Sequence, residues 1–105
     1  METRLCKGRF RPNRGRLNSF DELPKEKQMD FIEIKGKIKE LLNEDIEMCV
    51  FGSFLKGYWD DKSDYDVIFT SKKPSEIEIL KIKENIDFKV DIFFSQTLIN
   101  PILIP

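Results

Sequence analysis

The chain has 105 residues, 40% of them hydrophobic and 35% charged, with a formal net charge of −1, which suits one small α/β domain with a charged surface. No apolar run approaches the roughly 18–20 residues of a membrane-spanning helix, and no signal-like apolar stretch follows Met1, so we exclude an integral membrane protein and expect a cytoplasmic one. Histidine is absent, which excludes Ser-His-Asp and Cys-His catalysis and imidazole metal sites.

Residues 1–18 are predicted to be a basic N-terminal extension, because residues 1–20 carry a net charge of +5 and the remainder −6. Gly8, Pro12 and Gly15 interrupt regular structure there. The extension is either an arm that contacts nucleic acid or phosphate, or a solvated segment that can pack on the acidic surface of its own domain. We favour the second interpretation, because a charge run is a weak signal of nucleic-acid binding. Cys6 lies in this segment and is no catalytic candidate.

Residues 19–105 are predicted to form the domain proper, beginning with a helix that runs to about residue 42. Ser19 to Glu22 match a capping box, and Pro24 suits a first helical turn. Apolar residues then recur every three or four positions, as they do in an amphipathic helix that faces a core; these are Phe31, Ile34, Ile38, Leu41 and Leu42.

Three strands and a second helix are expected to follow. Residues 46–51 predict a strand that enters the interior, with Cys49 as a small buried hydrophobe. A polar stretch over residues 56–63 leads to a strand over 65–69, and Ser75 is placed to cap a helix that ends near residue 84. Residues 88–94 predict the third strand.

Three aspartates and a Gly-Ser pair gather where these strands begin and end. Gly52-Ser53 follows the first strand, where glycine lets backbone amides approach a phosphate. Asp64 and Asp66 alternate, so a strand places them on one face. Asp91 interrupts an otherwise apolar strand. Close carboxylates repel each other, and a shared divalent cation relieves that repulsion; oxygen ligands alone indicate Mg²⁺ or Mn²⁺.

Each of these features alone is typical of a turn or a solvated loop, but their order resembles the signature of the minimal nucleotidyltransferases of the polymerase β superfamily. Gly52-Ser53, a gap of ten residues and Asp64-x-Asp66 match that signature, and Asp91 matches the third acid of the family. Residues 52–57, Gly-Ser-Phe-Leu-Lys-Gly, are similar to the Gly-Ser-Phe-Ala-Arg-Gly run of the family. The resemblance covers roughly residues 25–95 and implies an α+β fold, a mixed sheet of about three or more strands backed by helices, with the site at one edge.

The resemblance also implies roles for the matching residues. Gly52 and Ser53 would hold the β- and γ-phosphates of a nucleoside triphosphate such as ATP. Asp64 and Asp66 would ligate the metal ions, and Asp91 would complete the second metal site and help to deprotonate the attacking hydroxyl. A two-metal clamp of this kind transfers a nucleoside monophosphate and releases pyrophosphate.

Four further residues of the loop are weaker candidates. Lys56 stands where the family often has arginine and is expected at the phosphates, with an exposed loop lysine as the alternative. Ser63 precedes the acid pair, as is typical of the family, and completes the expected nucleotide-binding set. Tyr58 and Trp59 either stack on a base or cover an edge of the core, and we favour the core.

In many relatives of this type, the nucleotidyltransferase is an antitoxin that transfers AMP to a tyrosine of an all-helical, HEPN-type toxin ribonuclease. We expect the same here, since the chain leaves little room for a separate acceptor-binding domain. The alternatives are a catalytically idle binding protein of the same fold, and nucleotidyl transfer to a small molecule or to an RNA 3′ end.

The C-terminal tail departs from the family, which usually continues with a helix. Two prolines disfavour a helix over residues 98–105, where five aliphatic residues occur within seven positions. The tail is either a surface for a partner or for a homo-oligomer, or it folds back on its own core.

Overall fold

The computed structural model describes residues 15–105 and contains three α-helices, a short 3₁₀ turn and three strands within that range. It is an α+β domain, as the resemblance implied. In chain order the elements are η1 (Phe20–Glu22), α1 (Lys25–Leu42), β1 (Met48–Phe51), α2 (Gly52–Lys56), β2 (Tyr65–Phe69), α3 (Glu76–Asn85) and β3 (Val90–Phe94). No helix within residues 15–105 is long and apolar enough to span a membrane.

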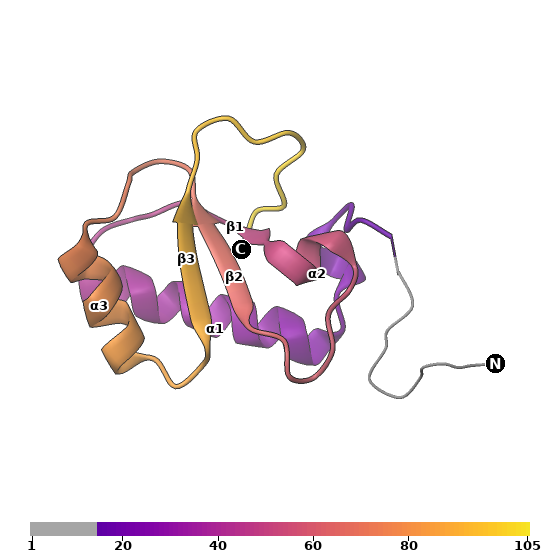
Figure 1. The fold of residues 1–105 in the computed structure, drawn as a ribbon, viewed down its shortest axis with the longest axis horizontal. Coiled ribbons are helices and arrows are strands. Elements are labelled where there is room, and N and C mark those ends of the chain that lie inside the picture. The colour runs from indigo at the N-terminus through magenta and orange to yellow at the C-terminus, as the bar shows by residue number, and fades with distance from the viewer. Residues whose placement is uncertain (1–14) are drawn as a thin grey trace.

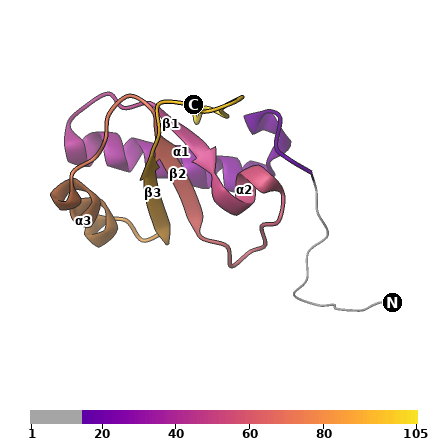
Figure 2. The ribbon, with the colours of Figure 1, turned by 45° about the horizontal axis from the view of Figure 1, so that its top comes forward.

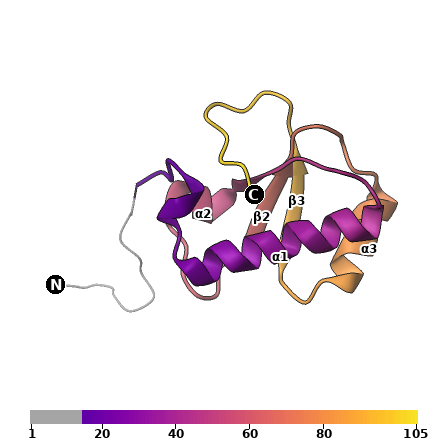
Figure 3. The same cartoon turned by 180° about the vertical axis from the view of Figure 1, so that it is seen from behind.

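The three strands form one mixed sheet in the order β1-β2-β3 (Figure 1). β1 pairs antiparallel with β2, and β2 pairs parallel with β3. The parallel pair requires a crossover, which α3 provides. α1 crosses the back of the sheet with α3 beside it (Figure 3), while α2 lies at the end of β1 (Figure 2). α1 and α3 therefore cover the same face of the sheet.

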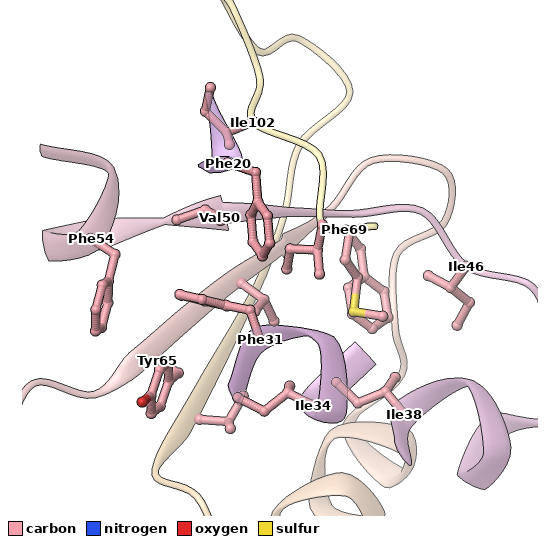
Figure 4. Packing of buried hydrophobic residues seen from close by; sticks show 14 of the residues in the cluster. Phe20, Phe31, Ile34, Ile38, Ile46, Val50, Phe54, Tyr65, Phe69 and Ile102 are labelled. Carbon is pink, nitrogen blue, oxygen red and sulfur yellow. The ribbon is translucent and has the colours of Figure 1, made fainter. Parts of the chain in front are cut away.

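The core lies between α1 and the sheet (Figure 4). Residues from α1, β1 and β2 that are at most 1% exposed form its centre, namely Phe31, Ile34, Ile38, Met48, Val50, Val67 and Phe69. The predicted apolar face of the helix is thus confirmed, although Leu41 and Leu42 are only partly buried at its end. Cys49 is buried as expected, and that burial raises the pKa of its thiol to about 11. Cys6 lies outside the described residues.

The start of the first helix differs from the prediction. Residues 20–22 form a separate 3₁₀ turn, the Ser19 side chain makes no capping hydrogen bond, and α1 begins only at Lys25 after Pro24. The reason is local, because a residue that precedes proline is disfavoured in the helical region, and Leu23 is accordingly extended with ψ 148°. The prediction of a capping box at Ser19 is therefore wrong.

The remaining elements lie close to their predicted positions, with one addition. The strand over residues 65–69 is confirmed, whereas the other two strands begin two residues later than expected. Ser75 caps α3 in a complete capping box with Glu78. The additional element is α2. We expected a loop after Gly52-Ser53, but the chain continues there into a short helix.

The C-terminal tail folds back on its own chain along the free edge of β1. Val50 N–H donates to the Ile102 carbonyl at 2.9 Å, and Ile104 N–H donates to the Met48 carbonyl at 3.0 Å. Ile102 and Ile104 are buried, while Leu103 between them is half exposed. Of the two alternatives for the tail, the structure therefore has the packed one, and this tail shields a strand edge that would otherwise be open to other chains.

Candidate active site

The register of the sheet brings two of the three predicted acids directly together. Asp66 of β2 pairs with Asp91 of β3, and on its other side Asp66 pairs with Phe51 of β1. Val67 and Phe69 are buried on the opposite face against α1. Side chains alternate along a strand, so Asp66 and Asp91 point to the face of the sheet opposite α1. For Asp66, this is the face opposite Val67 and Phe69 that the spacing predicted.

The electrostatics of the pair show how close the acids are. The pKa of Asp66 is raised, first by burial and then by the negative charges of Asp91 and Asp64, and a hydrogen bond with Asp91 raises it further. Asp64 and Asp91 therefore both act on Asp66. Asp64 itself is exposed just ahead of β2.

Gly52 lies against the side chain of Asp66. Its φ of +64° lies in the left-handed region, which glycine adopts without steric cost, and a Cβ at this position would lie 2.7 Å from Asp66 Cγ and 2.9 Å from Asp66 Cβ. Both the backbone conformation and the space require glycine. The Gly-Ser pair thus meets the acid motif from across the sheet, although ten residues of sequence separate the two.

A cavity of about 340 Å³ opens beside Asp64 and Asp91, and its lining also includes Lys83 and Lys89. Lys83 Nζ lies 3.3 Å from Asp91 Oδ1, in a half-exposed ion pair. The site therefore combines carboxylates with two cations that face the same space.

The other predicted nucleotide-binding residues lie around this centre. Ser53 is the second residue of α2, and its carbonyl accepts from Gly57 N–H and Tyr58 N–H. Lys56 is exposed at the end of the same helix. The Ser63 hydroxyl is engaged within its own loop, where it accepts from Asp60 N–H at 2.8 Å. Neither Lys56 nor Ser63 lines the cavity beside Asp91.

The two aromatic residues of the loop differ, and only Trp59 covers an edge of the core as we expected. Trp59 stacks on the buried ring of Phe54, with the ring centroids 5.1 Å apart, and so covers an edge of the core. Tyr58 is half exposed.

Sequence reasoning missed Lys83 and Phe93. Lys83 belongs to a helix with two lysines, Lys81 and Lys83, which in sequence look like a solvated face. Only the return of the chain through β3 places Lys83 beside Asp91. Phe93 is two residues beyond Asp91 and therefore on its face; its ring contacts that of Phe51 with centroids 5.3 Å apart. The alternation Asp91-x-Phe93 was the available signal.

The donor chemistry of the three acids fits a divalent cation. Within residues 15–105, no three or more His, Cys, Asp or Glu side chains lie so that together they could hold a metal ion. The acids nevertheless offer only hard oxygen donors, and Asp66 and Asp91 are direct neighbours. The pKa of Asp66 is raised first by burial and then by the charges of the other two acids. A divalent cation would relieve that repulsion, and such an oxygen set suits Mg²⁺ or Mn²⁺.

Comparisons with known proteins agree with this site. Residues 31–99, which include the Gly-Ser pair and all three acids, match the family described as nucleotidyltransferase domain. A search of curated proteins and a search of solved structures found no match to the chain. The family supports transferase activity on a nucleotide substrate and agrees with the resemblance to the minimal nucleotidyltransferases of the polymerase β superfamily. The chain belongs to the nucleotidyltransferase domain family.

Proposed function

We propose that this chain is a metal-dependent, cytoplasmic adenylyltransferase that moves AMP from ATP to a tyrosine hydroxyl of a helical, HEPN-type partner toxin and thereby acts as its antitoxin. The observation that carries the transfer chemistry is the pairing of Asp66 with Asp91 across β2 and β3, beside Gly52. The identity of the acceptor rests on the resemblance to minimal nucleotidyltransferases.

Each site residue has a role that its position supports. Gly52 leaves room for the Asp66 carboxylate and begins α2 next to it, so the amides of Gly52 and Ser53 are available to the β- and γ-phosphates. Asp64, Asp66 and Asp91 would hold Mg²⁺ or Mn²⁺, which supplies charge neutralisation at the phosphates when bound. Lys83 lines the same cavity and offers a cation to the triphosphate.

The transfer consists of one displacement at phosphorus. The acceptor hydroxyl oxygen attacks the α-phosphorus of ATP, a new oxygen–phosphorus bond forms, and the bond to the bridging oxygen of the β-phosphate breaks. Pyrophosphate leaves, and the proton of the hydroxyl goes to a carboxylate, for which Asp91 is the candidate. Orientation and electrostatic stabilisation supply the catalysis, so the lack of histidine is no obstacle.

The openness of the site supports a large acceptor. Asp64 is exposed, Asp91 is half-buried, and 43% of Phe93 is exposed on the same face. A side chain presented by another protein can therefore reach the acids without a channel. The basic extension that would favour nucleic acid falls almost entirely on residues 1–14, outside the described residues.

The test is label transfer. The protein is incubated with Mg²⁺ and each of the four α-labelled nucleoside triphosphates, with a helical toxin encoded beside it, with RNA bearing a free 3′ hydroxyl, or alone. Label on a toxin tyrosine, highest with ATP, supports the proposal, and Asp66→Asn serves as the inactive control. Label only on RNA or on a small hydroxyl compound would move the function to those acceptors. Nucleotide binding without any transfer would indicate the idle binding protein.

A further inference from the structure

Tyr65 lies between two of the candidate metal ligands in sequence but on the other side of the sheet. Asp64 and Asp66 flank it, and Tyr65 is 7% exposed within the core cluster. Neighbouring residues of a strand point to opposite faces, so its ring lies on the α1 side, directly behind the acids. Because Tyr65 is bonded through the backbone to both acids, contacts that hold its ring also restrain the segment that carries the two carboxylates.

The ring contacts the segments next to Gly52 and Asp91 and also packs on α1. It stacks on Phe54 of α2, the helix that begins with Gly52, with centroids 5.1 Å apart and planes 6° apart. It meets Phe88, just ahead of β3 and Asp91, edge-on at 5.5 Å. On the helix side it meets Phe31 of α1 edge-on at 5.0 Å. Figure 4 shows Phe54, Tyr65 and Phe31 gathered at one end of the core.

The hydroxyl of Tyr65 adds directional bonds to this packing. Lys27 of α1 donates from Nζ to the hydroxyl at 3.4 Å, and its ammonium lies 5.7 Å from the ring centroid. The hydroxyl in turn donates to Asp30 Oδ2. Lys27 is only 8% exposed, and a buried ammonium is costly without a partner. Lys27 and Asp30, three residues apart on one face of α1, therefore hold one orientation of the ring.

We propose that Tyr65 is a positioning residue, whose hydroxyl bonds to Lys27 and Asp30 fix the spacing between Gly52, the Asp64–Asp66 pair and Asp91. This inference rests on the proposed function of those residues. A phenylalanine would fill the same volume and keep the ring contacts, so packing alone does not require the hydroxyl. Directional bonds fix the rotation and height of the ring, because buried polar networks specify one arrangement where apolar contacts tolerate several.

The experiment compares Tyr65→Phe with wild type by Mn²⁺ binding to the protein alone, measured by titration calorimetry, and by transfer kinetics. We expect the Mn²⁺ dissociation constant to rise and kcat to fall, each by about tenfold, as is typical when the partners that orient metal ligands are removed. The KM for ATP is expected to stay within about twofold, because the phosphate-binding amides are unchanged. Tyr58→Phe, at a half-exposed loop tyrosine, is the matched control and is expected to leave both quantities unchanged.

A second pair of variants separates positioning from loss of stability. Asp30→Asn keeps an oxygen that accepts from the Tyr65 hydroxyl and is expected to retain Mn²⁺ affinity, whereas Asp30→Ala loses the acceptor and is expected to match Tyr65→Phe. Val67→Ala removes buried volume from the same strand without touching the hydrogen bonds, so it is expected to lower stability at unchanged Mn²⁺ affinity. If Tyr65→Phe does not fold, the comparison of the two Asp30 variants decides the question.

The outcomes separate this inference from the proposed function. The positioning role would be overturned, and the transferase left intact, by either of two results. One is a folded Tyr65→Phe with the Mn²⁺ affinity and kcat of wild type. The other is equal Mn²⁺ affinity in the two Asp30 variants. Weakened Mn²⁺ binding in Tyr65→Phe, together with no transfer by wild type to any acceptor, would support positioning and refute the transferase. A wild-type protein that neither binds Mn²⁺ nor transfers label would overturn both.

Discussion

Gly52 and Asp66 are fourteen residues apart in the sequence but in contact in the fold, where a Cβ on residue 52 would overlap the Asp66 carboxylate. The contact joins the two halves of the nucleotidyltransferase signature. It also shows that glycine serves here to let a carboxylate lie against the backbone, in addition to the approach of a phosphate that the motif predicts. The same contact makes residue 52 the glycine of the candidate site to test.

Gly52→Ala is expected to lower the free energy of unfolding by about 2–4 kcal/mol, from the left-handed backbone and the clash together, and to abolish transfer. Gly36→Ala is the matched control, because Gly36 lies inside α1 with nothing within 4 Å of an added Cβ. Alanine there is expected to stabilise by about 0.5–1 kcal/mol. Urea denaturation measures both, and equal effects at the two positions would contradict the contact with Asp66.

Asp66→Asn is expected to lower transfer by at least about a hundredfold, since it removes a carboxylate that would hold the metal and face the phosphates. Asp45→Asn is the control, because Asp45 is exposed and paired with Lys39 away from the site. Its transfer rate is expected to equal that of wild type. Label transfer under saturating Mg²⁺ measures both variants, and an active Asp66→Asn would remove Asp66 from the metal site.

The same substitution is expected to stabilise the fold at neutral pH. The pKa of Asp66 is raised above its ordinary value of 3.8 in the folded state, so the folded protein binds this proton more tightly than the unfolded chain. The stability that this proton contributes is present below about pH 4 and is lost as the pH rises through the folded value. Asp66→Asn should therefore be more stable than wild type at pH 7, by about 0.2–1 kcal/mol for like charges placed opposite each other.

The measurement is the difference in unfolding free energy between wild type and Asp66→Asn at pH 7 and at pH 3.5, which cancels the titration of all other acids. The difference is expected to shrink at the lower pH. Mg²⁺ is expected to stabilise wild type and to have little effect on the variant. A difference that grows on acidification would show that Asp66 has a favourable partner in the fold.

Lys83→Met is expected to raise the KM for ATP about tenfold, because one charge-assisted hydrogen bond to a phosphate contributes about 1.5–3 kcal/mol. The matched control is Lys81→Met, on the same helix but exposed and away from the cavity. Steady-state kinetics at saturating acceptor distinguish the two lysines. Identical KM values would show that Lys83 only neutralises Asp91.

Ile104→Ala is expected to destabilise the protein by about 2–4 kcal/mol, because Ile104 is buried against β1 and its truncation leaves a cavity. Leu103→Ala is expected to stay within about 0.5 kcal/mol, as that side chain is half exposed. Thermal denaturation compares them, and size-exclusion chromatography tests whether the loosened tail promotes association through the uncovered edge. Equal losses at the two positions would contradict the packed tail.

Local patterns in the sequence were sufficient for most elements. The strand over residues 65–69 and the cap at Ser75 are decided by neighbouring residues, through alternation and through the Ser75–Glu78 pair. The false capping box at Ser19 shows the limit of that approach, because the same motif fails where Leu23-Pro24 forces an extended backbone. A four-residue motif does not include the proline that follows it.

The sequence by itself determined the family of this protein, since the Gly-Ser pair and the three aspartates occur in the order of the nucleotidyltransferase signature. Only the tertiary structure decided how these residues meet. The parallel register places Asp66 beside Asp91, the return of the chain brings Lys83 to the same cavity, and Tyr65 turns its hydroxyl to Lys27 and Asp30. The physical reason is the sequence distance over which each pattern acts. Residue types and their local spacing fix which groups are present and which face of an element each takes. Contacts between distant segments depend instead on how helices and strands pack around one core.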